Sequence, residues 1–400
     1  MLHYLFDYLH EIGISLTAYN LFNYISVRSA LAIVTSLFLT VYVGKYIIDF
    51  LKRKLVQDKI RRLGLDGQLE KQGTPTMGGG IILIAILFPV LLFCRLDNIY
   101  VLILIVTSLW MALIGFVDDY IKVFRHQKSG LAARFKIFGQ VFLGLIISAV
   151  IFLHPDIVIK ENINESVHVD LILDDSAKTS KTPVFKNDEK ALKTTIPFLK
   201  NNQLSYEEVI SLISTNRFLI FFLFSFVIVF VITAVSNSAN LTDGIDGLAT
   251  GSSAIIGATL GVFCYVSGNV VFADYLDIMY IPNISELVVF MSAFVGACVG
   301  FLWYNSYPAQ IFMGDTGSLA LGGIIGVVSI LVRKELLLPI FCGIFFIESL
   351  SVILQVSYFK YTKKKHGLGQ RIFLMSPLHH HYQKKGIHES KIVTRFWIIC

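Results

Sequence analysis

The sequence predicts an all-α membrane protein with about ten transmembrane helices, and three observations support this prediction. Hydrophobic residues make up 55% of the 400 residues and charged residues only 16%, and the mean hydropathy is +0.68. A water-soluble domain needs a more charged surface than this. Apolar runs recur at the length of about 20 residues that a helix needs to cross a bilayer. Lysine and arginine gather in alternate loops, as the positive-inside rule expects.

The apolar runs define the predicted helices in chain order. Nine are long enough to span the membrane: 24–50, 77–94, 99–117, 137–153, 218–236, 249–267, 286–304, 317–332 and 336–358. A tenth begins near Lys391 and reaches only Cys400, so we predict a truncated last span. We expect residues 1–20 to form an amphipathic segment at the interface. We therefore predict one transmembrane domain over residues 1–400.

The basic residues predict the orientation of these spans. Three loops hold half of the 34 lysines and arginines, and the positive-inside rule places all three in the cytoplasm. The first carries Lys52, Arg53, Lys54, Lys59, Arg61, Arg62 and Lys71, the second Lys122, Arg125, Lys128, Arg134 and Lys136, and the third Lys360, Lys363, Lys364, Lys365 and Arg371. The polar stretch 154–217 then lies outside, and we interpret it as a partly ordered insertion without a catalytic signal.

The cysteines and the N-terminus exclude some other classes. The five cysteines are scattered singly with no CxxC spacing, which argues against a disulfide framework or a zinc site. The N-terminus lacks the basic start and cleavage site of a removed signal peptide, so we expect the spans themselves to direct insertion.

Four polar segments fall on the predicted cytoplasmic face. They are GFVDDY at 115–120, NLTDGIDGL at 240–248, NSYPAQIFMGDTGS at 305–318 and SPLHHHYQ at 376–383. Independent solvated loops have no reason to share one side of the membrane. A single active site that is supplied with a soluble cytoplasmic substrate requires it.

Acidic residues dominate the first three segments. Asp118 and Asp119 end an apolar span, where they form either a solvated helix end or a Mg²⁺ site, because Mg²⁺ prefers carboxylate and phosphate oxygens. Asp315 precedes an apolar run, where it is either a helix cap or a third metal ligand. We predict that Asp118, Asp119 and Asp315 bind Mg²⁺.

The second segment carries polar side chains at intervals of three residues. If it is helical, Asn240, Asp243 and Asp246 project from nearly one face, which is more than a helix cap needs. Gly244 and Gly247 allow close approach of a ligand or of other backbone. We therefore favour a functional role for the three polar residues over a helix cap.

The histidines and lysines supply groups that can contact phosphate. His379, His380 and His381 are consecutive, so they do not share a face, and contact of one or two of them with phosphate suits them better than ligation of a single ion. The alternative is a polar loop. Lys71, Lys122 and Lys136 are either orientation signals or cations that hold a diphosphate.

These segments resemble the polyprenyl-phosphate N-acetylhexosamine-1-phosphate transferases. The resemblance runs from about Tyr24 to Ile399, apart from the long outer loop. The stretches that carry the resemblance are KQGTPTMGG at 71–79, GFVDDYIKV at 115–123, VSNSANLTDGIDGL at 235–248, FLWYNSYPAQIFMGDTGSLALGG at 301–323 and SPLHHHY at 376–382. The triple histidine is typical of the branch that uses UDP-N-acetylmuramoyl-pentapeptide (UDP-MurNAc-pentapeptide).

The resemblance implies a fold and a reaction. It implies ten transmembrane helices with both termini outside, a homodimer in the bacterial inner membrane and an active site that faces the cytoplasm. It also implies a Mg²⁺-dependent exchange between UDP-MurNAc-pentapeptide and undecaprenyl phosphate, which gives lipid I and UMP in the first membrane step of peptidoglycan synthesis. Membrane lipids are then partners, and we expect no nucleic acid to bind.

Roles for single residues follow from the matching stretches. The resemblance implies that Asp118 is the base that deprotonates the lipid phosphate and that Asp315 holds Mg²⁺ on the diphosphate, with Asp119 as a further essential acid. The implied nucleotide and phosphate pocket is lined by Lys71, Thr76, Asn240, Asp243, Asp246, Asn305 and His379. The implied catalytic residues are Asp118, Asp119, Asp315 and His379. Gln383 departs from the pattern, because an acid is expected there.

Two other functions remain as alternatives. A transporter also carries acids in helices, but its sites tend to lie near the bilayer midplane between repeated halves, whereas these acids cluster at one face. A sister transferase that uses UDP-N-acetylglucosamine is the closer alternative, and a donor-substitution assay separates the two.

Overall fold

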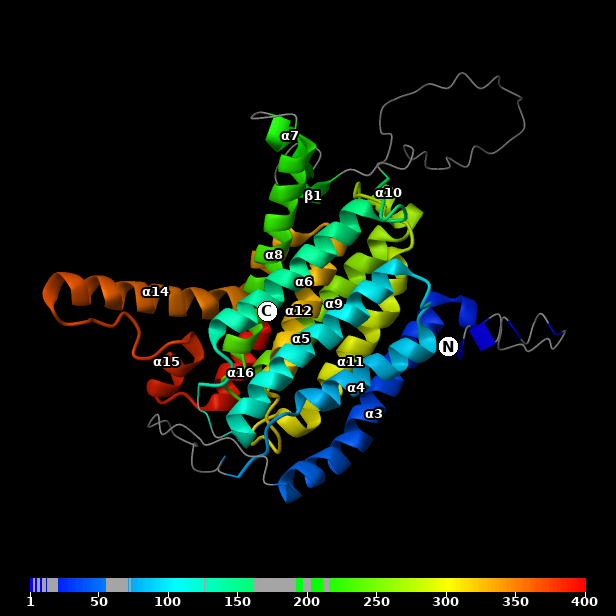
Figure 1. The fold of residues 1–400 in the computed structure, drawn as a ribbon. Helices are drawn as coiled ribbons and strands as arrows, with labels where there is room; N and C mark the ends of the chain where they lie inside the picture. The colour runs from blue at the N-terminus through cyan, green and yellow to red at the C-terminus, as the bar shows by residue number, and fades with distance from the viewer. Residues whose placement is uncertain are drawn as a thin grey trace, which may run out of the picture.

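The computed structural model of the chain describes residues 1, 2, 4, 5, 8, 12, 21–54, 71, 73–125, 127, 129–160, 192–196, 203–211 and 216–400. The described part is almost entirely helical, which confirms the predicted fold class (Figure 1). Its elements are α3 Ile25–Arg53, α4 Gly79–Phe93, α5 Ile99–Phe124, α6 Ala133–Leu153, β1 Lys193–Thr195, β2 Gln203–Ser205, α7 Tyr206–Ser211, α8 Arg217–Thr242, α9 Leu248–Ser267, α10 Val270–Tyr275, η2 Ile284–Glu286, α11 Leu287–Asn305, α12 Gly314–Leu331, η3 Glu335–Leu337, α13 Leu338–Phe341, α14 Gly343–His366, α15 Leu378–Lys384 and α16 Glu389–Ile399.

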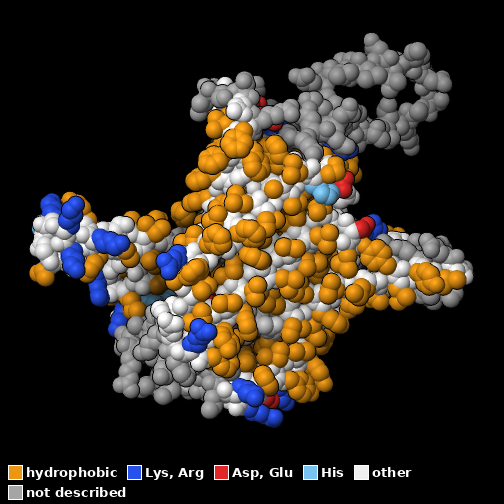
Figure 2. Space-filling view, viewed as in Figure 1, with side chains coloured by type: hydrophobic (Ala, Val, Ile, Leu, Met, Phe, Trp, Pro, Cys, Tyr) orange, Lys and Arg blue, Asp and Glu red, His pale blue; other side chains and the backbone are white. Residues whose placement is uncertain are grey.

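The predicted spans correspond to real helices. Among the described residues, eight helices are long and apolar enough to cross a membrane: α3, α5, α6, α8, α9, α11, α12 and α14. The run at 77–94 forms α4, which has only 15 residues and contains Pro89. At about 1.5 Å per residue, α4 is shorter than the hydrocarbon core of about 30 Å. The flank of the bundle is apolar, and Lys and Arg lie mostly at its margins (Figure 2).

Helix α12 lies at the centre of the bundle. Of the 18 residues of α12, 94% are buried inside the protein. In the most apolar 18-residue stretch of α3 the buried share is 28%. Small residues let helix backbones approach closely in a membrane. A Cβ at Gly322, for example, would lie 2.6 Å from Cα of Ser236 on α8. The central position of α12 places its first turn, with Asp315, among the ends of the surrounding helices.

The alternation of the helices brings the polar segments to one end of the bundle. Helices α5, α8 and α11 end there, and α4, α6, α9 and α12 begin there, as the chain direction in Figure 1 shows. The hairpin β1–β2 and helices α7 and α10 lie at the opposite end. The prediction that the four segments share one face is therefore confirmed in the arrangement of the helices.

The predicted span 336–358 corresponds to the long helix α14 only from Gly343 onward. It begins with η3 and α13, and the helix is interrupted at Cys342, where φ is −99° and ψ is 30°. Helix α14 then leaves the bundle sideways and continues to His366, and α15 and α16 fold back beneath it (Figure 1). Hydropathy did not reveal the break because the sequence is apolar on both sides of it.

The two ends of the chain and the insertion at 154–217 are described only in part. Within 154–217, β1 pairs antiparallel with β2, and the amide of Thr195 donates to the carbonyl of Arg333 at 3.0 Å, which docks this hairpin next to η3. The short last segment forms α16, which has 11 residues and packs against α9. The amphipathic segment predicted at 1–20 lies mostly outside the described residues.

Candidate active site

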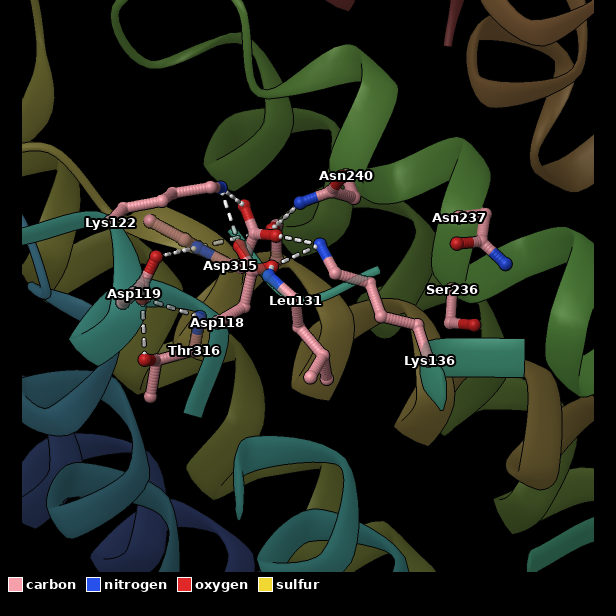
Figure 3. Close-up of polar contacts among 12 residues, drawn as sticks. Asp118, Asp119, Lys122, Leu131, Lys136, Ser236, Asn237, Asn240, Asp315 and Thr316 are labelled. Atoms are coloured by element: carbon pink, nitrogen blue, oxygen red, sulfur yellow. Dashed lines mark hydrogen bonds and ion pairs between the residues drawn. The ribbon is translucent and has the colours of Figure 1, made fainter. Parts of the chain in front are cut away.

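Two lysines bridge two buried aspartates at the polar end of the bundle. Lys122 Nζ lies 2.5 Å from Asp118 Oδ2 and 3.0 Å from Asp315 Oδ1. Lys136 Nζ lies 2.8 Å from Asp118 Oδ1 and 2.5 Å from Asp315 Oδ2. The lysines approach the carboxylates from opposite sides (Figure 3). Asp118 is completely buried and Asp315 is 8% exposed, so water screens these contacts poorly.

Three helices supply the members of this cluster. Asp118 and Lys122 lie one turn apart on α5, a spacing that brings side chains together on a helix surface. Lys136 comes from the first turn of α6, and Asp315 comes from the first turn of α12. The amide of Leu131, in the loop between α5 and α6, also donates to Asp118 Oδ1 at 2.7 Å. Packing of α5 and α6 around α12 thus creates the cluster.

Asp119 points to different partners from its neighbour. Its Oδ1 accepts from the amide of Asp315 at 3.0 Å, and its Oδ2 accepts from the amide and the hydroxyl of Thr316 at 2.9 and 2.6 Å. Asp119 therefore caps the first turn of α12 from another helix, which is the capping role that the sequence allowed for Asp315. Gly314 makes room for this contact, because it has φ +74° and a Cβ there would lie 2.7 Å from Asp119 Oδ2.

The three carboxylates suit a hard divalent cation. Asp118, Asp119 and Asp315 each offer an oxygen, and these oxygens lie within 4.8 Å of one another. Mg²⁺ prefers such oxygen ligands and is usually held by one or two carboxylates together with substrate phosphates. Three carboxylates face only two ammonium groups, so the fully ionised cluster keeps an excess negative charge. The donor set and the charge therefore both fit the predicted metal.

A second cluster surrounds Lys71. Its Nζ lies 2.7 Å from Asp246 Oδ1 and 2.6 Å from Glu389 Oε1, and the amide of Asp246 donates to the same Glu389 oxygen at 2.6 Å. Gln383 donates from Nε2 to Glu389 Oε2 at 3.3 Å. The acid that the resemblance implied at 383 is thus replaced by an amide that binds a neighbouring carboxylate. Lys71 also lies 5.7 Å from the ring centre of Tyr307.

The segment at 240–248 is not one helix, so the expected common face does not exist. Helix α8 ends at Thr242, and a turn follows up to the start of α9. Asn240 donates to the Ser318 hydroxyl at 2.8 Å, on the side of the first cluster, whereas Asp246 belongs to the second. Asp243 lies within electrostatic reach of both clusters. Burial, together with the negative charges of Asp315 and Asp119, holds the pKa of Asp243 well above its ordinary value.

Asn305 and Thr76 hold the loops around these clusters. Asn305 Oδ1 accepts from the amide of Gly247 and from the hydroxyl of Thr250, both at 3.1 Å, and its amide group donates to the carbonyl of Ile311. Thr76 is buried just before α4. The backbone beside it pairs with the segment before α12, because Phe312 donates to the carbonyl of Pro75 at 2.9 Å.

The three histidines have three different environments. His379 is completely buried, its Nδ1 lies 3.1 Å from Glu348 Oε2, and a Cβ at Gly244 would lie 2.2 Å from its Nε2. His380 Nδ1 lies 2.7 Å from the side-chain oxygen of Gln383. Burial, with His379 and Lys71 nearby, lowers the pKa of His380 to about 4, so its ring is neutral near pH 7.

His381 points away from the other two. Its Nδ1 accepts from the amide of Leu374 at 3.1 Å, and its ring packs edge-on against Phe373. The structure therefore brings His379 and His380 toward the turn after α8 and the second cluster. His381 instead stabilises the loop that leads into α15.

Two acids beside the site were missed from the sequence. Glu348 contacts His379, and it stands alone in the apolar run 336–358, where an intramembrane acid is functional by default. A lone acid in an apolar run was therefore enough to predict Glu348 as a site residue from the sequence. Glu389 had no comparable signal, because it lies in a mixed polar segment and reaches Lys71 only after the chain folds back beneath α14.

Buried carboxylates and lysines at one end of a membrane-embedded helical bundle define an integral membrane enzyme that handles anionic substrates. Residues 189–333 match the family model described as glycosyl transferase family 4. The chain is also similar over its full length to proteins named phospho-N-acetylmuramoyl-pentapeptide-transferase. Identity is 56% with the protein of Flavobacterium psychrophilum, 53% with that of Parabacteroides distasonis and 52% with that of Porphyromonas gingivalis, and each comparison covers 100% of this chain and 96% of the relative. The chain belongs to the phospho-N-acetylmuramoyl-pentapeptide-transferase family.

Proposed function

We propose that this protein transfers phospho-N-acetylmuramoyl-pentapeptide from its UDP-linked donor to undecaprenyl phosphate, with Mg²⁺ at the cluster of Asp118, Asp119 and Asp315. It is a transferase of the peptidoglycan pathway, as its family membership requires, and the products are lipid I and UMP. The observation that carries the site assignment is the set of three buried carboxylates bracketed by two lysines at the polar end of the bundle.

The two lysines can change partners during the reaction. In the described structure Lys122 and Lys136 neutralise Asp118 and Asp315. A diphosphate that enters the site offers them oxygens of higher charge, and phosphoryl transfer depends mainly on positioning and charge neutralisation. We infer that the lysines then bind the donor and release Asp118, which accepts the proton of the lipid phosphate. Asp119 keeps α12 in place and so fixes the position of Asp315.

The metal would be held by the carboxylates that the lysines release. When bound, Mg²⁺ neutralises the diphosphate and the charge that develops on the leaving UMP. Asp315 suits this role because it lies at the start of α12 and faces both lysines. We expect EDTA to abolish lipid I formation and excess Mg²⁺ to restore it.

The second cluster is our proposed continuation of the donor site. Lys71 carries the positive charge there, and Asp246 and Glu389 hold it in place. We propose that Thr76, Asn240, Asp243 and Asn305 line the pocket between the clusters, with the histidines at its edge. The neutral ring of His380 then acts as a hydrogen-bonding group, whereas His381 supports the loop.

Single amide substitutions test the metal-centred site. We expect Asp118→Asn and Asp315→Asn each to lower UMP release by more than about a hundredfold, as is typical when a preorganised charge is removed from an active site. The assay uses purified protein with UDP-MurNAc-pentapeptide, undecaprenyl phosphate and Mg²⁺. Asp49→Asn is the matched control, because Asp49 is an exposed acid near the same end of the bundle. Turnover close to that of the unchanged protein in either variant would contradict the proposal.

Donor substitution separates the proposed function from its rivals. We expect UMP release with UDP-MurNAc-pentapeptide and little with UDP-N-acetylglucosamine, and the reverse preference would identify the sister activity. Movement of a labelled solute across proteoliposomes without UMP release would identify a transporter instead.

Three further features remain proposals. We propose that residues 1–400 act as a single transferase domain, which one large apolar core shared by most of the described helices supports. We also propose that the active site faces the cytoplasm of a bacterial inner membrane, since basic residues of the first two predicted cytoplasmic loops, Lys52, Arg53, Lys122 and Lys136, lie at the same end of the bundle as the acids. The homodimer implied by the family resemblance is tested by mass photometry in lipid nanodiscs, where the mass above that of an empty nanodisc should equal that of two chains.

A further inference from the structure

A buried acid and a buried histidine lie beside the turn that follows α8. Glu348 on α14 and His379 in the first turn of α15 are both completely buried. His379 Nδ1 lies 3.1 Å from Glu348 Oε2, and the amide of His379 donates to Glu348 Oε1 at 3.2 Å. Among the described residues, no lysine or arginine forms an ion pair with Glu348. His379 therefore supplies the polar partner that a carboxyl group needs when it is withdrawn from water.

The far side of the His379 ring rests on the turn. A Cβ at Gly244 would lie 2.2 Å from His379 Nε2 and 2.8 Å from Cε1, so the ring occupies the space that a side chain at 244 would need. Neither ring nitrogen is exposed to water, and neither makes a hydrogen bond within the described part of the chain. In this arrangement the ring supports the turn by contact and does not itself reach a ligand in the pocket.

The turn carries acids of the proposed donor site on both sides of Gly244. Asp243 directly precedes this glycine, and Asp246 follows it by two residues. Asp246 Oδ1 lies 2.7 Å from Lys71 Nζ, and its Oδ2 accepts from the amide of Ala309 at 3.0 Å. A shift of the turn would therefore move the second cluster, and a displacement of about 1 Å in an active site can cost about a hundredfold in rate.

Helix α14 holds the histidine loop at another point as well. Gln355 lies seven residues after Glu348, which places it two turns further along the same side of the helix. Its Oε1 accepts from the amides of Ile372 and Phe373, both at 3.0 Å. The loop therefore stays attached to α14 when Glu348 is changed. The contribution that belongs to Glu348 alone is its hold on the His379 ring.

We propose that Glu348 is a positioning residue for the donor site, because it holds the His379 ring against Gly244 and so fixes the turn that carries Asp246. The inference rests on the proposed function, which assigns this turn to the donor pocket. The contacts lead from Glu348 to the cluster around Lys71. Loss of the carboxylate therefore weakens binding of the UDP-linked donor and leaves binding of undecaprenyl phosphate unchanged.

Steady-state kinetics of UMP release test this role in Glu348→Gln, with each substrate varied in turn. We expect the KM for UDP-MurNAc-pentapeptide to rise by about tenfold or more and the KM for undecaprenyl phosphate to stay within about twofold. A loss of folded protein would lower Vmax and leave both KM values unchanged. Glu207→Gln is the matched control, because Glu207 is an exposed acid on α7 at the opposite end of the bundle.

The outcome separates this inference from the function on which it rests. An unchanged donor KM in Glu348→Gln, measured while the unchanged protein is active, would overturn the positioning role. Absence of UMP release by the unchanged protein would overturn the proposed function instead.

Gly244→Ala tests the same contact from the side of the turn. The added methyl group displaces the ring and leaves Glu348 in place, and Gly244 does not have a positive φ, so its backbone accepts alanine. We expect its donor KM to rise as in Glu348→Gln, and the double variant to resemble either single variant, because both changes remove one contact. Gly80→Ala is the control, since a Cβ there meets nothing within 4 Å. Multiplicative effects, or a donor KM in Gly244→Ala equal to that in Gly80→Ala, would overturn the proposal.

Discussion

Two adjacent aspartates on α5 have different partners, and this difference organises the site at the scale of the residue. Consecutive residues on a helix point about 100° apart. Asp118 therefore contacts the two lysines, whereas Asp119 binds the first turn of α12. The sequence predicted both acids and the lysines as site residues. It could not assign their partners, because these come from α6 and α12, which are far away along the chain.

We predict that loss of the charge on Asp119 weakens the protein as well as the reaction. Asp119→Asn replaces an oxygen that accepts hydrogen bonds from α12 with an amide nitrogen, so we expect the free energy of unfolding to fall by about 1–3 kcal/mol. Thr316→Val removes only one of the three hydrogen bonds and should cost about 1 kcal/mol. Denaturant unfolding in detergent measures both, and an Asp119→Asn protein as stable as the unchanged protein would contradict the capping role.

We predict strong coupling between Lys71 and Glu389. Lys71→Met leaves Asp246 and Glu389 buried without a cation, and removal of one partner of a buried ion pair costs about 3–5 kcal/mol. Lys71→Met combined with Glu389→Gln removes one of the stranded charges and should recover part of that loss. A double-mutant cycle of unfolding free energies measures the coupling, and additive effects would show that the contact contributes little.

At the scale of the element, the spans were predictable and their interruptions were not. A run of apolar residues predicts a helix from composition alone, which is why the nine runs correspond to helices. The break at Cys342 and the turn after Thr242 depend on which neighbours each segment meets. The turn matters most for the site, because it sends Asn240 and Asp246 to different clusters where the spacing of three had predicted one face.

The junction between the β1–β2 hairpin and η3 should respond to pH. Burial lowers the pKa of Lys334 to about 8 from its ordinary value of 10.5. Between these two pH values the unfolded chain holds a proton that the folded protein has lost, so the free energy of unfolding rises with pH. We expect the unfolding temperature to rise between about pH 8 and about pH 10 in the unchanged protein and not in Lys334→Met. A fall over this interval would contradict the prediction.

At the scale of the whole molecule, the bundle has a chemically distinct end, and the sequence predicted it. Charge in the loops and the alternation of spans placed four segments together, and the helices of the structure do the same (Figure 1). The compartment that this end faces is a prediction from the positive-inside rule.

Cysteine labelling tests the sidedness of the molecule. Lys385 is exposed beside α15 near the polar end, and Tyr275 is exposed at the end of α10 on the opposite side. We expect an impermeant maleimide to label Tyr275→Cys in intact spheroplasts and to label Lys385→Cys only after permeabilisation. Four of the five native cysteines are buried, which keeps the background low. The opposite labelling pattern would place the active site outside.

The burial of α12 has a consequence for how the acceptor must approach. A helix enclosed on nearly all sides cannot slide or rotate without disturbing every neighbour, and Asp119 also fastens its first turn. The depth of Asp315 relative to the membrane surface is therefore set by the architecture and not by the substrate. A long-chain lipid has to bring its own headgroup to that depth, so the length and tilt of the surrounding helices help to decide which lipids can react.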